Sequence, residues 1–157
     1  MRPVSLPSSL LAQMRAHARE TYPDEACGFL IGVGPDPTEP EARRILSVER
    51  AENTFDGERR RRFLIRPEEL RDVERRAEST GRPVVGFYHS HPDHPARPSQ
   101  FDQDHAWPWY TYVVLSVTAS ASSAVGAFEL DADAAVFREV ELRVEPESLS
   151  APSVVEG

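Results

Sequence analysis

The sequence of 157 residues contains no lysine, and all 18 of its basic residues are arginine. Codon usage in a GC-rich genome is the plain explanation. The consequence is that no lysine side chain can serve as an attachment point for a protein modifier. The sequence has one cysteine, Cys27, which excludes an intramolecular disulfide and a zinc site built from several thiolates.

Long apolar runs are also missing. No segment approaches the roughly 18 apolar residues of a membrane-spanning helix. The N-terminal segment lacks the apolar core and the small-residue cleavage site of a signal peptide. We therefore expect a cytoplasmic protein that does not interact with a membrane.

Positive charge is in short supply. The sequence carries 26 acidic and 18 basic residues, a formal net charge of -8. Because nucleic-acid binding depends largely on positive charge, this balance argues against nucleic acid as the main partner. The length suits one domain with a buried core. We expect this domain to cover residues 1–145 and a flexible tail to cover 146–157.

Hydrophobic periodicity predicts helices that alternate with strands. One helix is expected over 6–22, with Pro7 in its first turn, and a second over 66–81, with acidic residues at its start and Gly81 after its end. A short third helix is expected over 98–107. The expected strands, which are apolar runs closed by turn residues, cover 26–34, 43–53, 82–91, 110–117, 124–130 and 134–144. The first two should form a hairpin around a proline-rich turn at 36–42, and 54–63 should be an exposed loop. This alternation predicts an α/β fold in which helices cover a sheet.

The segment from Tyr88 to Asp102, "YHSHPDHPARPSQFD", is the most informative part of the chain. His89 and His91 come at the carboxyl end of an expected strand, and residues two apart on a strand point to the same face. Both imidazoles can therefore bind one metal ion. Asp102, at the start of the next helix, could supply a third ligand. Two histidines and one carboxylate form the ligand set of a catalytic zinc ion, although non-haem iron uses the same set.

A purely structural interpretation of the same residues is open. "SQFD" has the form of a capping box, in which Ser99 caps a helix and Asp102 bonds back to the first residue. A carboxylate upstream favours the metal site instead. Glu25, in "YPDEACGFLIG", lies just before the first expected strand, and a partly buried carboxylate there could act as a general base.

Several motifs together resemble the JAMM signature of the MPN-plus metalloproteases. "HSHPDHPARPSQFD" is similar to its H-x-H-P and P-S-x-x-D elements, and "EACGFLIG" to its upstream glutamate strand. "AEN" and "RRFLIRPEEL" resemble the connecting region of short prokaryotic members. The likeness runs from about Leu6 to Val144. It implies a single MPN domain of the JAB1/cytidine-deaminase-like type, with a mixed β-sheet flanked by helices.

The resemblance also implies a reaction. His89, His91 and Asp102 would bind Zn²⁺, Glu25 would be the general base, and Ser99 would hydrogen bond to the oxyanion. The expected activity is hydrolysis of a peptide or isopeptide bond. The substrate would be a ubiquitin-like or sulfur-carrier protein that ends in diglycine. The sequence does not specify the individual substrate or the oligomeric state.

Other functional classes fit the sequence less well. A non-catalytic MPN scaffold that only binds partners is the main alternative, although such members usually lack ligands that are all present here. A zinc deaminase of nucleobases needs a pair of cysteines, which this chain does not have. The related DNA-repair branch is disfavoured by the acidic charge and by the absence of a DNA-binding module.

Five further features have a structural and a functional interpretation. Cys27 is expected to be a packing residue rather than a nucleophile, because apolar residues follow it. His94 and His105 could lie beside the metal ligands or the substrate. The run Arg59–Arg62 could bind an acidic partner or form a solvated surface. The two tryptophans, Trp107 and Trp109, are expected to anchor the core.

Overall fold

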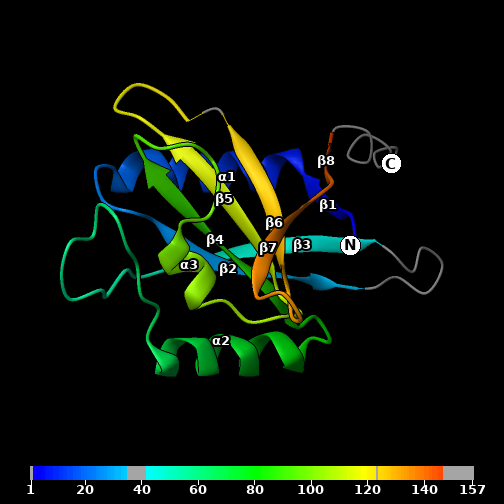
Figure 1. Ribbon diagram of the computed structural model, residues 1–157. Helices are drawn as coiled ribbons and strands as arrows, with labels where there is room; N and C mark the ends of the chain where they lie inside the picture. Colours follow the sequence, from blue (N-terminus) through cyan, green and yellow to red (C-terminus); the bar gives the residue numbers. More distant parts are fainter. Residues whose placement is uncertain (1, 35–41, 123, 147–157) are drawn as a thin grey trace.

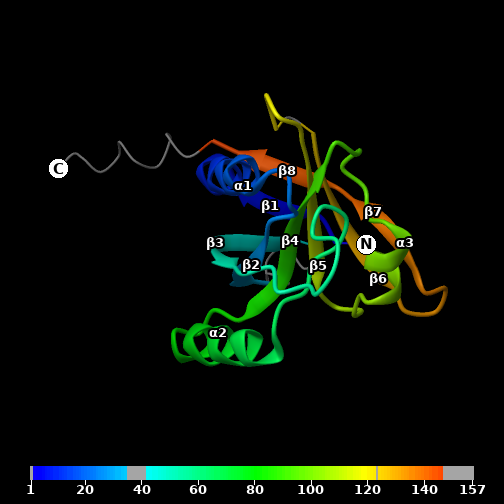
Figure 2. The same cartoon turned by 90° about the vertical axis from the view of Figure 1, so that its left-hand side faces the viewer.

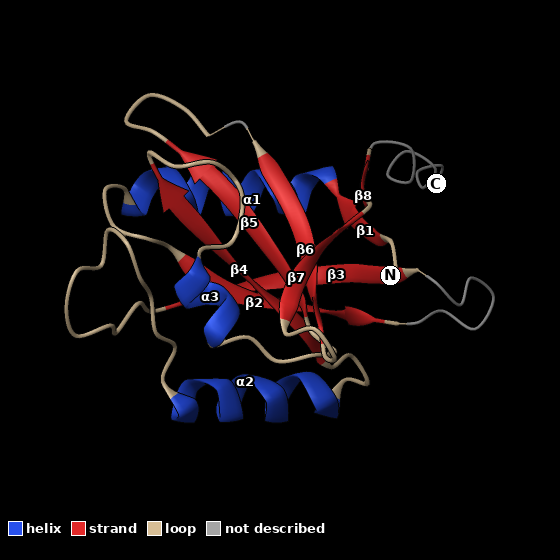
Figure 3. Ribbon diagram, in the orientation of Figure 1, coloured by secondary structure: helices blue, strands red, loops and turns tan. Residues whose placement is uncertain are grey.

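The computed structural model describes residues 2–34, 42–122 and 124–146. In these ranges the chain forms a mixed sheet and three helices (Figures 1 and 3). The helices are α1 (Ser8–Thr21), α2 (Pro67–Ser79) and α3 (Gln100–Asp104). The strands are β1 (Val4–Pro7), β2 (Cys27–Val33), β3 (Arg43–Ala51), β4 (Val84–Pro92), β5 (Thr111–Val117), β6 (Val125–Asp131), β7 (Val136–Val140) and β8 (Leu142–Glu145). Their order across the sheet is β7–β6–β5–β4–β2–β3–β1–β8.

The two faces of the sheet are covered by different helices. Helix α1 packs against one face through a core cluster that includes Met14 of the helix and Tyr88 of β4. Helix α2 packs against the other face, where Val73 joins a second cluster with Phe29 and Phe87. Figure 2 shows α1 and α3 on opposite sides of β4 and β5. Because side chains alternate along a strand, neighbouring residues of β4 belong to opposite faces.

Most of the expected elements are present. Strands β2 and β3 form the predicted antiparallel pair. The fully buried strand β4 pairs with β2 in antiparallel and with β5 in parallel orientation. The prediction of an α/β fold with a mixed sheet and covering helices is confirmed. None of the helices in the described ranges is long and apolar enough to span a membrane.

The N-terminal boundary was predicted wrongly. Residues 4–7 form the short strand β1 rather than leading into a helix, and Pro7 is the residue before the helix instead of part of its first turn. Val4 and Leu6 alternate toward the core and are fully buried. Because β1 lies between β3 and β8, pairing with distant strands outweighs the local helical pattern.

Two further predictions are wrong. The single strand expected at 134–144 is divided at Glu141 into β7 and β8, which pair with β6 and β1 at opposite edges of the sheet. Trp107 and Trp109 are not core residues, because 67% and 48% of their surfaces are exposed. Trp109 instead lies under the guanidinium of Arg43, whose Cζ is 4.4 Å from the ring centre. The turn predicted at 36–42 and the tail predicted at 146–157 fall almost wholly outside the described residues.

Candidate metal centre

His89 and His91 project from the carboxyl end of β4 on the face that α2 and α3 cover. Both side chains are buried, with 1% and 7% of their residue surfaces exposed. Their Nε2 atoms lie 3.2 Å apart. The residue between them, Ser90, points to the opposite face, as the alternation of a strand requires. The predicted convergence of the two imidazoles is therefore present.

Glu25 reaches the same place because of the register between β2 and β4. Cys27 pairs with His89, and the backbone N–H of Ser90 donates to the carbonyl of Ala26 at 3.0 Å. Continuing this antiparallel register by two residues puts Glu25 opposite His91. Glu25 is 2% exposed. Ligand atoms of Glu25, His89 and His91 all lie within 4.8 Å of one another, so this buried group can hold a metal ion.

Asp102 meets the histidines from the start of α3, and the same carboxylate closes the predicted capping box. Its Oδ2 accepts the backbone N–H of Ser99 at 2.8 Å, and Ser99 Oγ accepts the backbone N–H of Asp102 at 3.1 Å. That Oδ2 also lies 3.1 Å from Nε2 of His89 and 3.1 Å from Nε2 of His91. The capping carboxylate therefore also lies within reach of both histidines, so capping does not exclude the predicted role as a ligand.

The three inward-facing atoms fit a zinc ion. The distances of 3.2, 3.1 and 3.1 Å among the two Nε2 atoms and Asp102 Oδ2 form a nearly equilateral triangle. Ligands at zinc-like distances in a tetrahedron are about 3.3 Å from one another. The donor types and their spacing thus match one face of a zinc tetrahedron.

The tautomer of His91 points to a cation in the same position. His91 Nδ1 lies 3.1 Å from the carbonyl oxygen of Pro95. A carbonyl only accepts, so Nδ1 carries the proton and, in the neutral ring, Nε2 presents a lone pair. This lone pair faces the carboxylate of Asp102, which is also an acceptor. Two acceptors at 3.1 Å need a proton or a metal ion to bridge them. A metal-bound histidine usually donates its other ring N–H to a carbonyl or carboxylate oxygen, as His91 does here.

The two carboxylates differ in their electrostatics. Burial alone would raise the pKa of Asp102, but His89, His91 and the Ser99 N–H hold this pKa well below its usual range. Burial raises the pKa of Glu25 to about 9, and the charge of Asp102 adds to the effect. Glu25 Oε1 is buried without a hydrogen-bond partner among the described residues. Asp102 therefore stays charged and is suited to bind a cation, whereas Glu25 is protonated at neutral pH unless a cation lies beside it.

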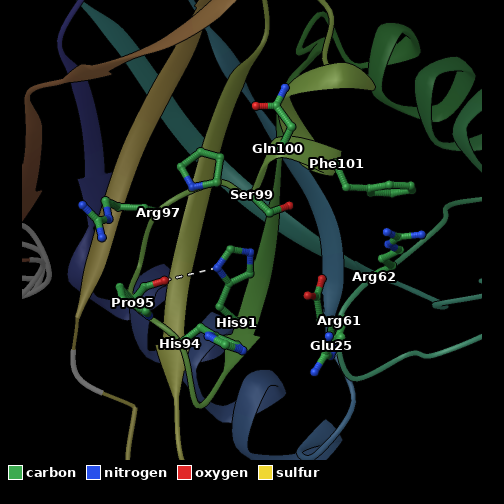
Figure 4. Close-up of a pocket in the computed structure, with 11 residues that line it drawn as sticks. Glu25, Arg61, Arg62, His91, His94, Pro95, Arg97, Ser99, Gln100 and Phe101 are labelled. Carbon is green, nitrogen blue, oxygen red and sulfur yellow. Dashed lines mark hydrogen bonds between the residues drawn. The ribbon is translucent and has the colours of Figure 1, made fainter.

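A groove of about 480 Å³ opens beside these residues. Glu25, His91 and Ser99 line it together with residues of the 54–66 loop and of the segment between β4 and α3 (Figure 4). Because Ser99 Oγ accepts a hydrogen bond in the cap, its hydroxyl hydrogen is available to a molecule in the groove.

Comparison with known proteins agrees with this geometry. Residues 7–130 match the family described as prokaryotic homologs of the JAB domain. The chain belongs to this family. The JAB (MPN/JAMM) fold expected from the motifs is thereby confirmed.

Individual proteins are similar to this JAB-domain chain over most of its length. A protein named desampylase, from Haloferax volcanii, is 35% identical over 109 residues, which are 69% of this chain and 73% of that protein. A solution structure of a Salinibacter ruber protein has a TM-score of 0.68 and 36% identity, with 92% of each chain covered. A solution structure from Desulfitobacterium hafniense has a TM-score of 0.76 and 29% identity, covering 92% of this chain and 94% of that one.

Other residues singled out in the JAB-domain sequence have clear positions. Cys27 is fully buried, and burial raises the pKa of its thiol, which fits a packing role. His94 lines the groove. The ring of His105 packs on Phe101 with its Nδ1 2.8 Å from the Phe101 carbonyl oxygen. In the Arg59–Arg62 run all four residues are exposed, and Arg61 and Arg62 line the groove.

Three residues of the JAB-domain centre were not identified from the sequence. Ser90 Oγ accepts the backbone N–H of Ala26 at 2.8 Å, and alternation along the strand could have indicated its position. Asn53 donates through Nδ2 to the carbonyls of Glu25 and Arg62, both at 3.1 Å. The ring of Phe63 stacks on His89 with 4.7 Å between ring centres. The last two lie in "AEN" and "RRFLIRPEEL", which resemble the connecting region of short prokaryotic members. The sequence does not show their contacts, because the partners are distant or lie in a loop.

Proposed function

We propose that this protein is a zinc-dependent metalloprotease that hydrolyses a peptide or isopeptide bond at the C-terminus of a ubiquitin-like or sulfur-carrier protein ending in diglycine. The observation that carries the proposal is the triangle of two histidine Nε2 atoms and Asp102 Oδ2, with Glu25 beside it. Family membership and the similarity to the Haloferax volcanii desampylase support a protease. They also favour zinc over iron.

In this proposal His89, His91 and Asp102 hold the metal ion. Zinc, when bound, polarises a carbonyl group and lowers the pKa of water to about 7. Glu25 takes a proton from the attacking water and later delivers the same proton to the leaving amine. The carboxylate is therefore in its starting state after each reaction cycle. Burial raises the proton affinity of Glu25. The charge of a cation held beside it would lower its pKa toward neutral pH, where the carboxylate can accept and release a proton.

Ser99 is proposed to stabilise the charge that develops on the substrate carbonyl oxygen. Its Oγ already accepts the N–H of Asp102, which fixes the oxygen and leaves the hydroxyl hydrogen to donate. Ser99 thus serves the cap through its lone pair and the substrate through its proton.

The replacement Glu25→Gln tests the mechanism. The zinc-loaded proteins are incubated with ubiquitin-like carriers extended beyond diglycine, and the products are weighed by mass spectrometry. The wild type should release the extension, whereas Glu25→Gln should bind one zinc ion per chain and cleave about 10²–10⁴-fold more slowly. Glu68→Gln, on the exposed start of α2, is the matched control and should cleave at the wild-type rate. Cleavage at that rate by Glu25→Gln would show that another group is the base.

A non-catalytic scaffold is the second candidate, and the same measurements distinguish it. A scaffold would bind a carrier protein without cutting any extension or adduct. The complete ligand set disfavours this alternative, because a surface that only binds partners has no need for a buried carboxylate beside two histidines.

A further inference from the structure

We propose that the groove selects substrates whose segment around the scissile bond carries acidic side chains, and that Arg61, Arg62 and Arg97 recognise them. These three residues are called the arginine rim below. The inference rests on the proposed peptidase function and adds the chemistry of its substrate. All three rim residues are exposed and line the same groove as Glu25 and His91.

The rim occupies both walls of the groove. Arg61 and Arg62 belong to the loop between β3 and α2, and Arg97 to the segment between β4 and α3. Figure 4 shows Arg97 on one side of His91 and the other two on the opposite side. Cationic groups on two walls suit an extended peptide with several carboxylates, whereas a single free α-carboxylate needs one cation.

The charges of the rim are not neutralised by ion pairs within the described residues. Arginines elsewhere, such as Arg50 with Glu20 and Arg76 with Glu49, form ion pairs at 2.8 and 2.7 Å. None of the rim arginines has a carboxylate within 4.0 Å among the described residues. Glu25, at the floor, is the one acidic side chain among the described residues that line the groove. A chain of net charge -8 therefore presents a local cationic surface at its candidate active site.

The loop that carries two of the three rim residues is fixed to the site. Asn53 Oδ1 accepts the N–H groups of Phe55 and Leu64 at 3.1 and 3.2 Å and so closes the loop. The backbone N–H of Glu25 donates to the carbonyl of Arg59 at 2.7 Å. The guanidinium of Arg62 lies over the Phe101 ring, with Cζ 4.4 Å from its centre. Preorganised cations lose less conformational entropy when they bind a carboxylate.

An acidic peptide fits better than nucleic acid as the partner. Both carry anionic groups, but the floor of the groove holds the residues proposed to cut an amide bond. The net negative charge of the chain would repel an extended phosphate backbone beyond the groove. Short-range pairing with carboxylates is compatible with that charge, because exposed charges more than about 10 Å apart are screened at 0.1 M salt.

Binding and cleavage are measured with three labelled peptides that share a central Gly-Gly-X sequence and have acidic, neutral or basic flanks. Anisotropy titrations use zinc-loaded Glu25→Gln protein, so binding is read without turnover. We expect the acidic peptide to bind about tenfold more tightly than the neutral one. The double replacement Arg61→Glu and Arg97→Glu should remove this preference, because each exposed ion pair contributes about two- to fivefold in affinity. The same replacement should favour the basic peptide.

Arg71→Glu, an exposed change of equal charge on α2, is the control and should leave the preference intact. Amidating the acidic peptide's C-terminus should also leave it intact, and loss of binding there would overturn the assignment to side chains. Equal affinity for the three peptides would overturn the proposal. Tighter binding of the acidic peptide without cleavage by the wild type would support the rim and contradict the peptidase function, so the two failures are distinguishable.

Discussion

Ser90 and Ala26 are joined by two hydrogen bonds, one in each direction. The Ser90 N–H donates to the Ala26 carbonyl at 3.0 Å, and the Ala26 N–H donates to Ser90 Oγ at 2.8 Å. The serine between the two histidines therefore fixes the backbone next to Glu25 from the opposite face of the sheet. This pair explains how Glu25, a residue outside β2, acquires a defined position beside the candidate metal ligands.

Replacing Ser90 with alanine should displace the proposed base, Glu25, and have little effect on zinc binding. The change leaves the buried N–H of Ala26 without its partner and should cost about 1–3 kcal/mol of stability. Zinc affinity, measured by competition with a chromophoric chelator, should stay close to that of the wild type. The kcat for a diglycine-extended carrier should fall, with little change in KM.

Ser79→Ala is the matched control, since Ser79 Oγ donates to a carbonyl on the exposed end of α2. It should change neither stability nor kcat appreciably. An unchanged kcat in the Ser90 variant would mean that the register of β2 and β4 alone positions Glu25.

Asn53 should hold the loop that carries Arg59–Arg62 in one conformation. In Asn53→Asp the acceptor remains, but the amide donor to the carbonyls of Glu25 and Arg62 is lost. The new carboxylate also faces two carbonyl oxygens. Trypsin, which cleaves after arginine, should therefore cut at 59–62 faster than in the wild type, as followed by mass spectrometry.

Gln13→Glu, an amide-to-carboxylate change at an exposed position of α1, controls for the added charge. Its digestion pattern should match that of the wild type. Equal trypsin sensitivity of the Asn53 variant would show that other contacts hold the loop.

Much of the fold and of the metal centre could be predicted from local pattern. Strand alternation predicted that His89 and His91 converge, and spacing predicted both interpretations of Asp102. What could not be predicted depends on partners far away in the sequence. β1 forms because β3 and β8 flank it, and the Asn53 contacts require the loop to fold back on Glu25. The exposure of Trp107 and Trp109 could not be predicted, because an aromatic side chain is buried only where another element of the fold packs against it.

The two roles of Asp102 can be separated by mutation. Asp102→Asn keeps an oxygen that can accept the Ser99 N–H but removes the charge that faces the histidines. Zinc affinity should fall by about 10- to 100-fold or more, since loss of even an outer partner of a metal ligand costs that much. The measurement is zinc content after dialysis against graded chelator concentrations.

Ser99→Ala is the complementary variant. It removes the cap acceptor of the Asp102 N–H and should cost about 0.5–2 kcal/mol of stability, while zinc remains bound. If Asp102→Asn retains zinc as tightly as the wild type, the carboxylate is a cap and not a ligand.

His17 should make the protein sensitive to acid. It lies on the buried face of α1, with Nδ1 2.7 Å from the hydroxyl of Tyr88. Burial, assisted by the charge of Arg50, lowers the pKa of His17 from 6.5 to about 4. Below pH 6.5 the unfolded chain binds a proton that the folded chain excludes. The stabilisation from neutral His17 is therefore complete above pH 6.5 and is lost as the pH falls toward 4, a change of about 3 kcal/mol.

The test compares urea unfolding of the wild type and His17→Gln between pH 7 and pH 4.5, with chelator present so that metal binding does not contribute. The variant cannot take up this proton, so its stability should fall by about 2–3 kcal/mol less over that range than the stability of the wild type. His94→Gln, at an exposed position, should behave as the wild type does. An equal loss in His17→Gln and the wild type would mean that His17 is protonated as readily in the folded chain as in the unfolded one.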